Sequence, residues 1–99
     1  MKDLIKLNKL YDCYGELLTD KQKDYFTSYY FDNLSLQEIA ENNQVSRTAV
    51  GNSLKQTNKK LEEFERVIKN VKFKDEIQVI IKKDNIKEIK NEIQNLLDK

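Results

Sequence analysis

The stretch "SLQEIAENNQVSRTAV", residues 35 to 50, contains two serines eleven positions apart, each followed by apolar residues at helical spacing. Ser35 and Glu38 have the spacing of a capping box, in which each side chain bonds a free backbone N–H at the start of a helix. Ser46 repeats the serine cap of this pattern. The stretch therefore predicts two helix starts in close succession.

Apolar residues flank both predicted caps in the same way. Leu34 and Ile39 stand at the two positions of a hydrophobic staple around the first cap, and Val45 and Val50 stand there around the second. Such staples fix the angle at which the chain enters a helix. This arrangement favours two helices folded against each other over neighbouring turns of a bundle.

The segment "ENNQV", residues 41 to 45, must reverse the chain between these helices in three or four residues. Asparagine tolerates the left-handed backbone conformation better than most residues other than glycine. We therefore expect Asn42 or Asn43 to make the turn of a helix-turn-helix.

The rest of the chain favours helix, since its 99 residues include no proline and two glycines. We predict a first helix from about Asp3 to Leu17, and a second from a capping box at Thr19 and Gln22 to about Phe31. The apolar stripe of the first helix consists of Leu4, Leu7, Tyr11, Tyr14 and Leu18. The fold class is all-α, with a single core for its length.

The second predicted helix carries more than half of the aromatic residues. They are Tyr25, Phe26, Tyr29, Tyr30 and Phe31. We interpret these rings as core with one or two tyrosines at the surface. The alternative is a platform for stacking nucleic-acid bases, which requires exposed rings.

A long helix follows Ser46 and keeps one apolar stripe over about 22 residues. The stripe consists of Val50, Leu54, Thr57, Leu61, Phe64 and Ile68. The pattern blurs at residues 70–74, and the remainder reads as one broken or two short amphipathic helices. Their apolar seam consists of Ile86, Ile89, Ile93 and Leu96. We expect a helix-turn-helix domain over residues 1–70 and a helical extension over 71–99 that packs on the core or on a partner.

Positive charge is concentrated in one short segment, although the net charge of the chain is only +1. Residues 1–45 carry five lysines and eight acids, and residues 61–99 carry nine charges of each sign. Residues 46–60 carry four basic residues and no acid. An attraction to nucleic acid would therefore be local to the long helix.

Several kinds of function find no support in the residue types present. The chain has no histidine, one cysteine (Cys13) and no glycine-rich phosphate loop, and the acids Glu62, Glu63 and Glu65 suit a solvated helix face. We expect no enzyme activity, catalytic residue, cofactor or metal. The lone cysteine and the lack of a long apolar run predict a cytoplasmic protein without membrane insertion.

One face of the long helix offers side chains suited to nucleic acid. Thr48, Asn52, Lys55 and Lys59 fall opposite the apolar stripe, while Ser46 and Arg47 lie in the first turn near free backbone amides. Such residue types reach base edges and phosphates from a helix in the major groove. The alternative is an ordinary solvated face of a lysine- and asparagine-rich chain.

These motifs, in this order, resemble those of the YlxM-like helix-turn-helix proteins, which are themselves similar to the fourth conserved region of sigma factors. The resemblance rests on "LYDCYGELLTDKQKDYFTSYYFDNLSLQEIAENNQVSRTAV", residues 10–50, and covers about residues 7–61. It contains "LLTDKQ", a tyrosine pair before an acidic turn, "LSLQEIAE" and "VSRTAV". Several ordered motifs are more specific than an isolated helix-turn-helix match.

The resemblance implies a cytosolic, non-enzymatic regulatory protein associated with the signal recognition particle pathway. The basic stretch makes DNA or signal recognition particle RNA a candidate partner, and the isoleucine-rich tail makes proteins of the particle or a second copy in a homodimer candidate partners. Carried over by motif, the recognition-helix positions are Ser46, Arg47, Thr48, Asn52 and Lys55. The positions that pack the two helices together are Leu36, Ile39, Ala40, Val45, Val50 and Leu54.

The sequence departs from the family pattern at two places. Asn43 and Gln44 stand where an apolar residue and glycine are usual, and Gly51 stands where an aromatic residue is usual. Two hypotheses follow. The chain contacts nucleic acid through residues 47–60, or it is an adaptor or homodimer module that uses the same scaffold and its isoleucine-rich tail without reading nucleic acid.

Overall fold

The computed structural model describes residues 4–83 and 85–98, which form six α-helices and one 3₁₀ turn and contain no strand. The helices are α1 (Leu4–Tyr14), α2 (Asp20–Tyr30), α3 (Leu36–Asn43), α4 (Arg47–Ile68), α5 (Asn70–Ile81) and α6 (Ile86–Leu97). They divide into two compact units, residues 1–68 and 69–99. This division falls two residues before the domain boundary expected after residue 70.

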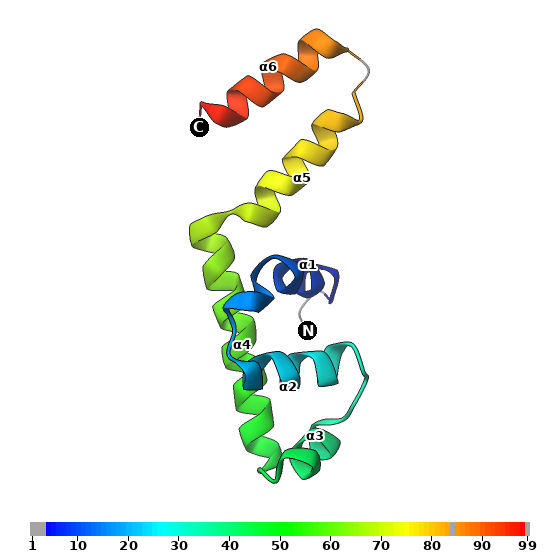
Figure 1. Ribbon diagram of the computed structural model, residues 1–99, viewed down its shortest axis with the longest axis vertical. Helices are drawn as coiled ribbons and strands as arrows, with labels where there is room; N and C mark the ends of the chain where they lie inside the picture. The colour runs from blue at the N-terminus through cyan, green and yellow to red at the C-terminus, as the bar shows by residue number, and fades with distance from the viewer. Residues whose placement is uncertain (1–3, 84, 99) are drawn as a thin grey trace. The chain divides into compact units, whose positions relative to one another are not determined.

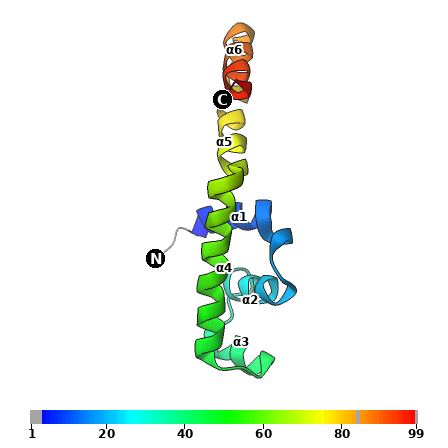
Figure 2. The ribbon, with the colours of Figure 1, turned by 90° about the vertical axis from the view of Figure 1, so that its left-hand side faces the viewer.

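In the first unit α1, α2 and α3 pack one after another along the long helix α4, as Figures 1 and 2 show. The predicted all-α fold with a helix-turn-helix core is confirmed. Its buried apolar residues are Leu7, Leu10, Tyr14, Leu18, Tyr25, Phe26, Ile39, Ala40, Val50, Leu54 and Leu61. Helix α4 is therefore the common wall against which the other three helices pack.

The first helix is shorter than predicted, because the chain tightens into a 3₁₀ turn at Gly15–Leu17. Gly15 is buried, and a side chain there would be a tight fit, since a Cβ would lie 3.2 Å from the Tyr11 ring. The predicted stripe is correct except that Leu10 is also buried and Leu4 is half exposed. The expected start at Asp3 lies outside the described residues.

The capping box of α2 is formed as predicted. The Gln22 amide donates to Thr19 Oγ1 at 3.2 Å, and the Thr19 amide donates to Gln22 Oε1 at 3.0 Å. Tyr25 and Phe26 are buried, Tyr29 and Tyr30 are partly exposed, and Phe31 is an exposed ring that the sequence did not indicate. Phe31 is the C-cap of α2, where the chain turns away from the core.

The turn between α3 and α4 is made by Gln44 and not by Asn42 or Asn43. Both asparagines belong to α3, where Asn43 Nδ2 donates to the carbonyl oxygen of Ile39 at 2.8 Å. Gln44 takes the left-handed conformation (φ 55°, ψ 42°), and the next amide, that of Val45, bonds the Ala40 carbonyl oxygen. Helix α3 therefore continues to Asn43, and the turn at Gln44 lets Val45 of the second staple pack on the core.

The strained Gln44 gives a first prediction, which is that Gln44→Gly stabilises the first unit by about 0.5–1 kcal/mol. Glycine removes the steric cost of the left-handed conformation, and this gain exceeds its greater loss of entropy on folding. Thermal unfolding followed by circular dichroism measures the change. In the matched control, Gln37→Gly inside α3, the same substitution destabilises by about 1 kcal/mol. A lower melting temperature for Gln44→Gly would contradict the prediction.

Helix α4 keeps its predicted stripe only as far as Phe64. Val50, Leu54, Thr57 and Leu61 are buried, Phe64 is partly buried, and Ile68 is exposed. The helix ends because Lys69 adopts a left-handed conformation with φ 58°. Lysine itself does not mark this break, since it is a good helix former, but the apolar pattern blurs directly after it, at residues 70–74.

The second unit consists of α5 and α6, which pack on each other around the buried Ile80. Helix α5 begins at Asn70, so the stretch that blurs in the sequence is helical. Asn85 caps α6 by accepting from the Glu88 amide at 3.1 Å. A hydrogen-bonded ion pair with Glu92 raises the pKa of Lys83. Of the two interpretations of the tail, two short helices is the correct one.

Candidate nucleic-acid interface

Every residue predicted to contact nucleic acid lies on α4 or directly before its first residue, Arg47. Ser46, Arg47, Thr48, Asn52, Lys55 and Lys59 are all exposed. The buried Val50, Leu54 and Leu61 lie on the opposite side of the same helix. The helical period thus turns one side of α4 to the core and presents the other as a continuous polar stripe.

The first turn of α4 leaves donors available for an anion. Ser46 Oγ accepts from the Ala49 amide at 3.0 Å, and the Ser46 carbonyl oxygen accepts from Val50 at 3.2 Å. The Ser46 hydroxyl keeps its own hydrogen, and the amides of Arg47 and Thr48 precede the first helical bond. Together with the exposed Arg47 guanidinium they suit a phosphate group.

The packing of α3 against α4 fixes the direction of this turn. Buried residues from α2, α3 and α4 form one cluster, onto which the apolar partners of both staples pack. The cluster consists of Tyr25, Ile39, Ala40, Val50 and Leu54, and its partly buried neighbours include Leu34, Leu36 and Val45. Both staples are therefore formed, and α4 starts at an angle set by side-chain packing.

Gly51 faces α3 rather than the exposed stripe. A Cβ at this position would lie 4.0 Å from Leu36 Cδ1, which is ordinary van der Waals contact. The missing side chain is therefore not needed for packing. It also does not open the outward face of α4, because the position faces Leu36 of α3.

The basic side chains along α4 differ in whether they pair with other groups of the chain. Neither Arg47 nor Lys55 has an ion pair in the described part of the chain. Lys60 Nζ donates to Gln22 Oε1 of α2 at 3.4 Å. The pKa of Glu63 is lowered by its hydrogen bond with Arg66, then by the charge of Arg66, and to a lesser extent by Lys59. The positive charge is thus strongest towards the N-terminal half of α4.

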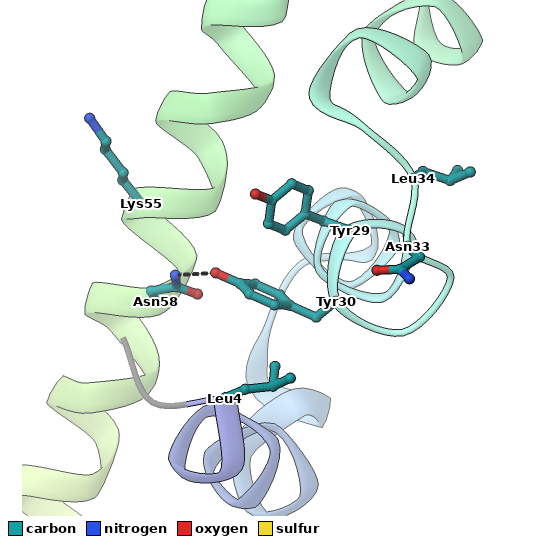
Figure 3. Close-up of a pocket in the computed structure, with 7 residues that line it drawn as sticks. All are labelled: Leu4, Tyr29, Tyr30, Asn33, Leu34, Lys55 and Asn58. Atoms are coloured by element: carbon teal, nitrogen blue, oxygen red, sulfur yellow. Dashed lines mark hydrogen bonds between the residues drawn. The ribbon is translucent and has the colours of Figure 1, made fainter. Parts of the chain in front are cut away.

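A cavity of about 570 Å³ lies beside this face, between α4, the end of α2 and the loop that follows it, and its lining is drawn in Figure 3. It is lined by Leu4, Tyr29, Tyr30, Asn33, Leu34, Lys55 and Asn58. Asn58 was missed at the sequence level. It stands four residues after Leu54 and three before Leu61, and a polar residue at such a core position is the signal that could have identified it.

Across residues 4–83 and 85–98 there is no group of three or more acids or cysteines placed to hold a metal ion. No helix in these ranges combines the length and the apolar character needed to cross a bilayer.

Comparison with known proteins gives one consistent result. The family model described as "Putative helix-turn-helix protein, YlxM / p13 like" (UPF0122) matches residues 1–99. A UPF0122 protein of Malacoplasma penetrans (strain HF-2) is 45% identical over 96 residues, which are 97% of this chain and 83% of that protein. One of Bacillus thuringiensis (strain Al Hakam) is 44% identical over 78 residues, 78% of this chain and 71% of that protein. One of Shouchella clausii (strain KSM-K16) is 45% identical over 65 residues, 66% of this chain and 60% of that protein.

Proposed function

We propose that this chain, which belongs to the family of YlxM/p13-like helix-turn-helix proteins, is a non-enzymatic regulatory protein that binds nucleic acid through residues 47–60 of α4. One observation carries the proposal. The longest stretch of the sequence without an acid, residues 42–61, carries four basic residues and includes the exposed face of the second helix of a helix-turn-helix. A solvated face of average composition would include acids, as α6 does.

The geometry suits entry of the first turns of α4 into the major groove of a DNA duplex. There Thr48 and Asn52 would reach base edges, while Ser46, Arg47 and Lys55 would contact phosphates. Major-groove entry of this kind is closed to A-form RNA, whose major groove is too narrow for side chains to read. On RNA the same stripe would contact phosphates or an unpaired loop.

The resemblance to YlxM-like proteins adds a pathway to the proposal. We propose that the nucleic acid is either a DNA site or the RNA of the signal recognition particle, and that the protein acts with that particle in the cytoplasm. Few basic residues contribute, so the affinity of one copy is low and increases if two copies bind together. The affinity depends on salt because the contacts are with phosphates.

Fluorescence anisotropy tests the proposal with labelled signal recognition particle RNA and a random DNA duplex, each at low and at physiological salt. We expect saturable binding to one of them that persists at physiological salt. Preference for the RNA would place the protein in the particle pathway, and preference for DNA would make it a transcription regulator. Binding to neither, or equally weak binding to both that salt abolishes, would contradict nucleic-acid recognition.

The second candidate function, a homodimer or adaptor module, is favoured by apolar residues left exposed in the second unit. Ile86, Ile93 and Leu97 of α6 and Val79 and Ile81 of α5 are exposed. Apolar side chains at this density often mark a contact with another chain. Such a contact would be made by residues 69–99 and would not require α4 to bind nucleic acid.

This candidate predicts a change in molecular mass in solution. If α6 joins two copies, Ile93→Glu converts a dimer to a monomer, because a charge is costly to bury at an apolar interface. Sedimentation equilibrium measures the mass. The control Asn91→Glu adds the same charge at an exposed polar position of α6 and leaves the dimer intact. A wild-type chain that is monomeric at high concentration would rule out the homodimer.

A further inference from the structure

The cavity beside α4 has the features of a built ligand site. Its volume of about 570 Å³ falls within the range of roughly 300–1,000 Å³ that is usual for sites of small organic ligands. All of its lining residues belong to the first unit, and they come from α1, α2, the following loop and α4. Figure 3 shows both tyrosine hydroxyls directed from α2 towards α4.

Asn58 supplies a second and independent observation. Asn58 is only 7% exposed. Its Nδ2 donates to the Tyr30 hydroxyl at 2.9 Å, while its Oδ1 is buried and has no hydrogen-bond partner among the described residues. Buried polar atoms are almost always paired, so an unpaired one calls for an explanation. The amide thus retains one N–H hydrogen and its carbonyl oxygen for a ligand.

The remaining walls of the cavity combine aromatic rings with polar groups. The rings of Tyr29 and Tyr30 meet edge to face, with centroids 5.0 Å apart and planes at 89°. Asn33 adds a second amide, and Lys55 extends outward from the rim in Figure 3. A flat heterocycle could stack on a ring and pair with an amide.

We infer that this cavity binds a nucleobase that carries an amino group, such as adenine or cytosine. On such a base an amino donor stands beside a ring-nitrogen acceptor, which matches the carbonyl oxygen and the free N–H of Asn58. Two sources share this chemistry, a free nucleotide and an unstacked base of a bound nucleic acid. The second source rests on the function proposed above.

The amide oxygen of Asn58 is shielded from solvent. A ligand reaches this oxygen when the amide turns towards the cavity. The Tyr30 hydroxyl both donates and accepts, so it keeps its bond to Asn58 in either orientation of the amide.

Nuclear magnetic resonance of the full ¹⁵N-labelled chain tests the inference with adenosine 5′-monophosphate. The matched ligand is purine riboside 5′-monophosphate, which lacks only the amino group. We expect adenosine monophosphate to shift the side-chain amide signals of Asn58 and Asn33 and to bind about tenfold more tightly than purine riboside monophosphate. Equal affinities, or no shift of these signals at millimolar ligand, would overturn the inference.

Asn58→Leu provides the matching variant, because leucine has a similar volume and no polar atom. We expect it to abolish the preference for the amino group while the melting temperature stays the same or increases, since a buried unpaired oxygen is removed. If this variant does not fold, Tyr29→Phe and Asn33→Ala are used instead, and weaker binding of adenosine monophosphate is expected for both because these residues also line the cavity. The control Gln56→Leu, at an exposed position of α4 outside the cavity, keeps the preference. A preference that persists in Asn58→Leu would contradict the assigned role.

Two further titrations identify the source of the base. If Asn58→Leu weakens binding of an adenine-rich single-stranded RNA but not of a DNA duplex, the site takes an unstacked base of RNA. If it changes only the binding of adenosine monophosphate, the site takes a free nucleotide. Arg47→Glu, outside the cavity, separates the two proposals. If Arg47→Glu loses duplex binding and the wild-type chain does not respond to adenosine monophosphate, the cavity proposal alone is overturned. If the wild-type chain responds to adenosine monophosphate but binds no nucleic acid, the α4 interface alone is overturned.

Discussion

Reversing the charges of Lys55 and Lys59 together weakens binding to nucleic acid at every sequence tested, by at least about tenfold at physiological salt. Both side chains lie on the exposed stripe of α4, one and two turns beyond Asn52. Each phosphate contact releases about 0.9 counterion from a duplex, so the slope of log affinity against log salt falls by about 2. Anisotropy titrations of Lys55→Glu, Lys59→Glu over a series of salt concentrations measure both quantities.

A second double variant separates contact from net charge. Lys6→Glu, Lys21→Glu changes the charge of the chain by the same amount at exposed positions on α1 and α2. We expect this control to weaken binding only slightly and to keep the salt slope of the wild type, because screening limits the reach of a charge to about 8 Å at physiological salt. If both double variants lose equal affinity, the stripe on α4 is not the contact surface.

The helix-turn-helix was predictable because its signals are local. Each cap lies within three residues of the amide it bonds, and each staple joins residues five positions apart, so neither depends on distant parts of the chain. The exposed stripe of α4 followed in the same way. Once Val50 and Leu61 define the buried side, the helical period assigns the opposite side to solvent.

The errors arose where small local preferences competed with packing. Asparagine favours the left-handed conformation over glutamine by a small margin, and the fit of Val45 into the α3–α4 cluster decided the position of the turn. The cavity was not predictable in detail, because Asn58 meets Tyr30, 28 residues earlier in the chain, only in the folded unit. The sequence shows a polar residue, Asn58, at a core position, but it does not show that Tyr30 is its partner.

The largest effect on stability is expected for Phe26→Ala, which lowers the free energy of unfolding of the first unit by about 3–5 kcal/mol. Phe26 is 0% exposed and stacks on Tyr11 with ring centroids 4.6 Å apart and planes at 4°. It also contacts the rings of Tyr30 and Phe31. Its removal leaves a cavity where α1 meets α2 and deprives three aromatic rings of their common neighbour.

Denaturant unfolding followed by tyrosine near-ultraviolet circular dichroism measures this loss for the first unit alone, because all five tyrosines lie in residues 1–68. A unit of this size has a total stability of about 3–10 kcal/mol, so Phe26→Ala leaves a large fraction unfolded at 25 °C. The control Phe31→Ala removes a ring that also contacts Tyr11 but is 48% exposed, and it costs about 1 kcal/mol. Equal losses would show that the rings act as a surface cluster. A larger loss for Phe26 establishes that its stack is the centre of the core, which holds α1 and α2 against α4 and so fixes the helix that is proposed to bind nucleic acid.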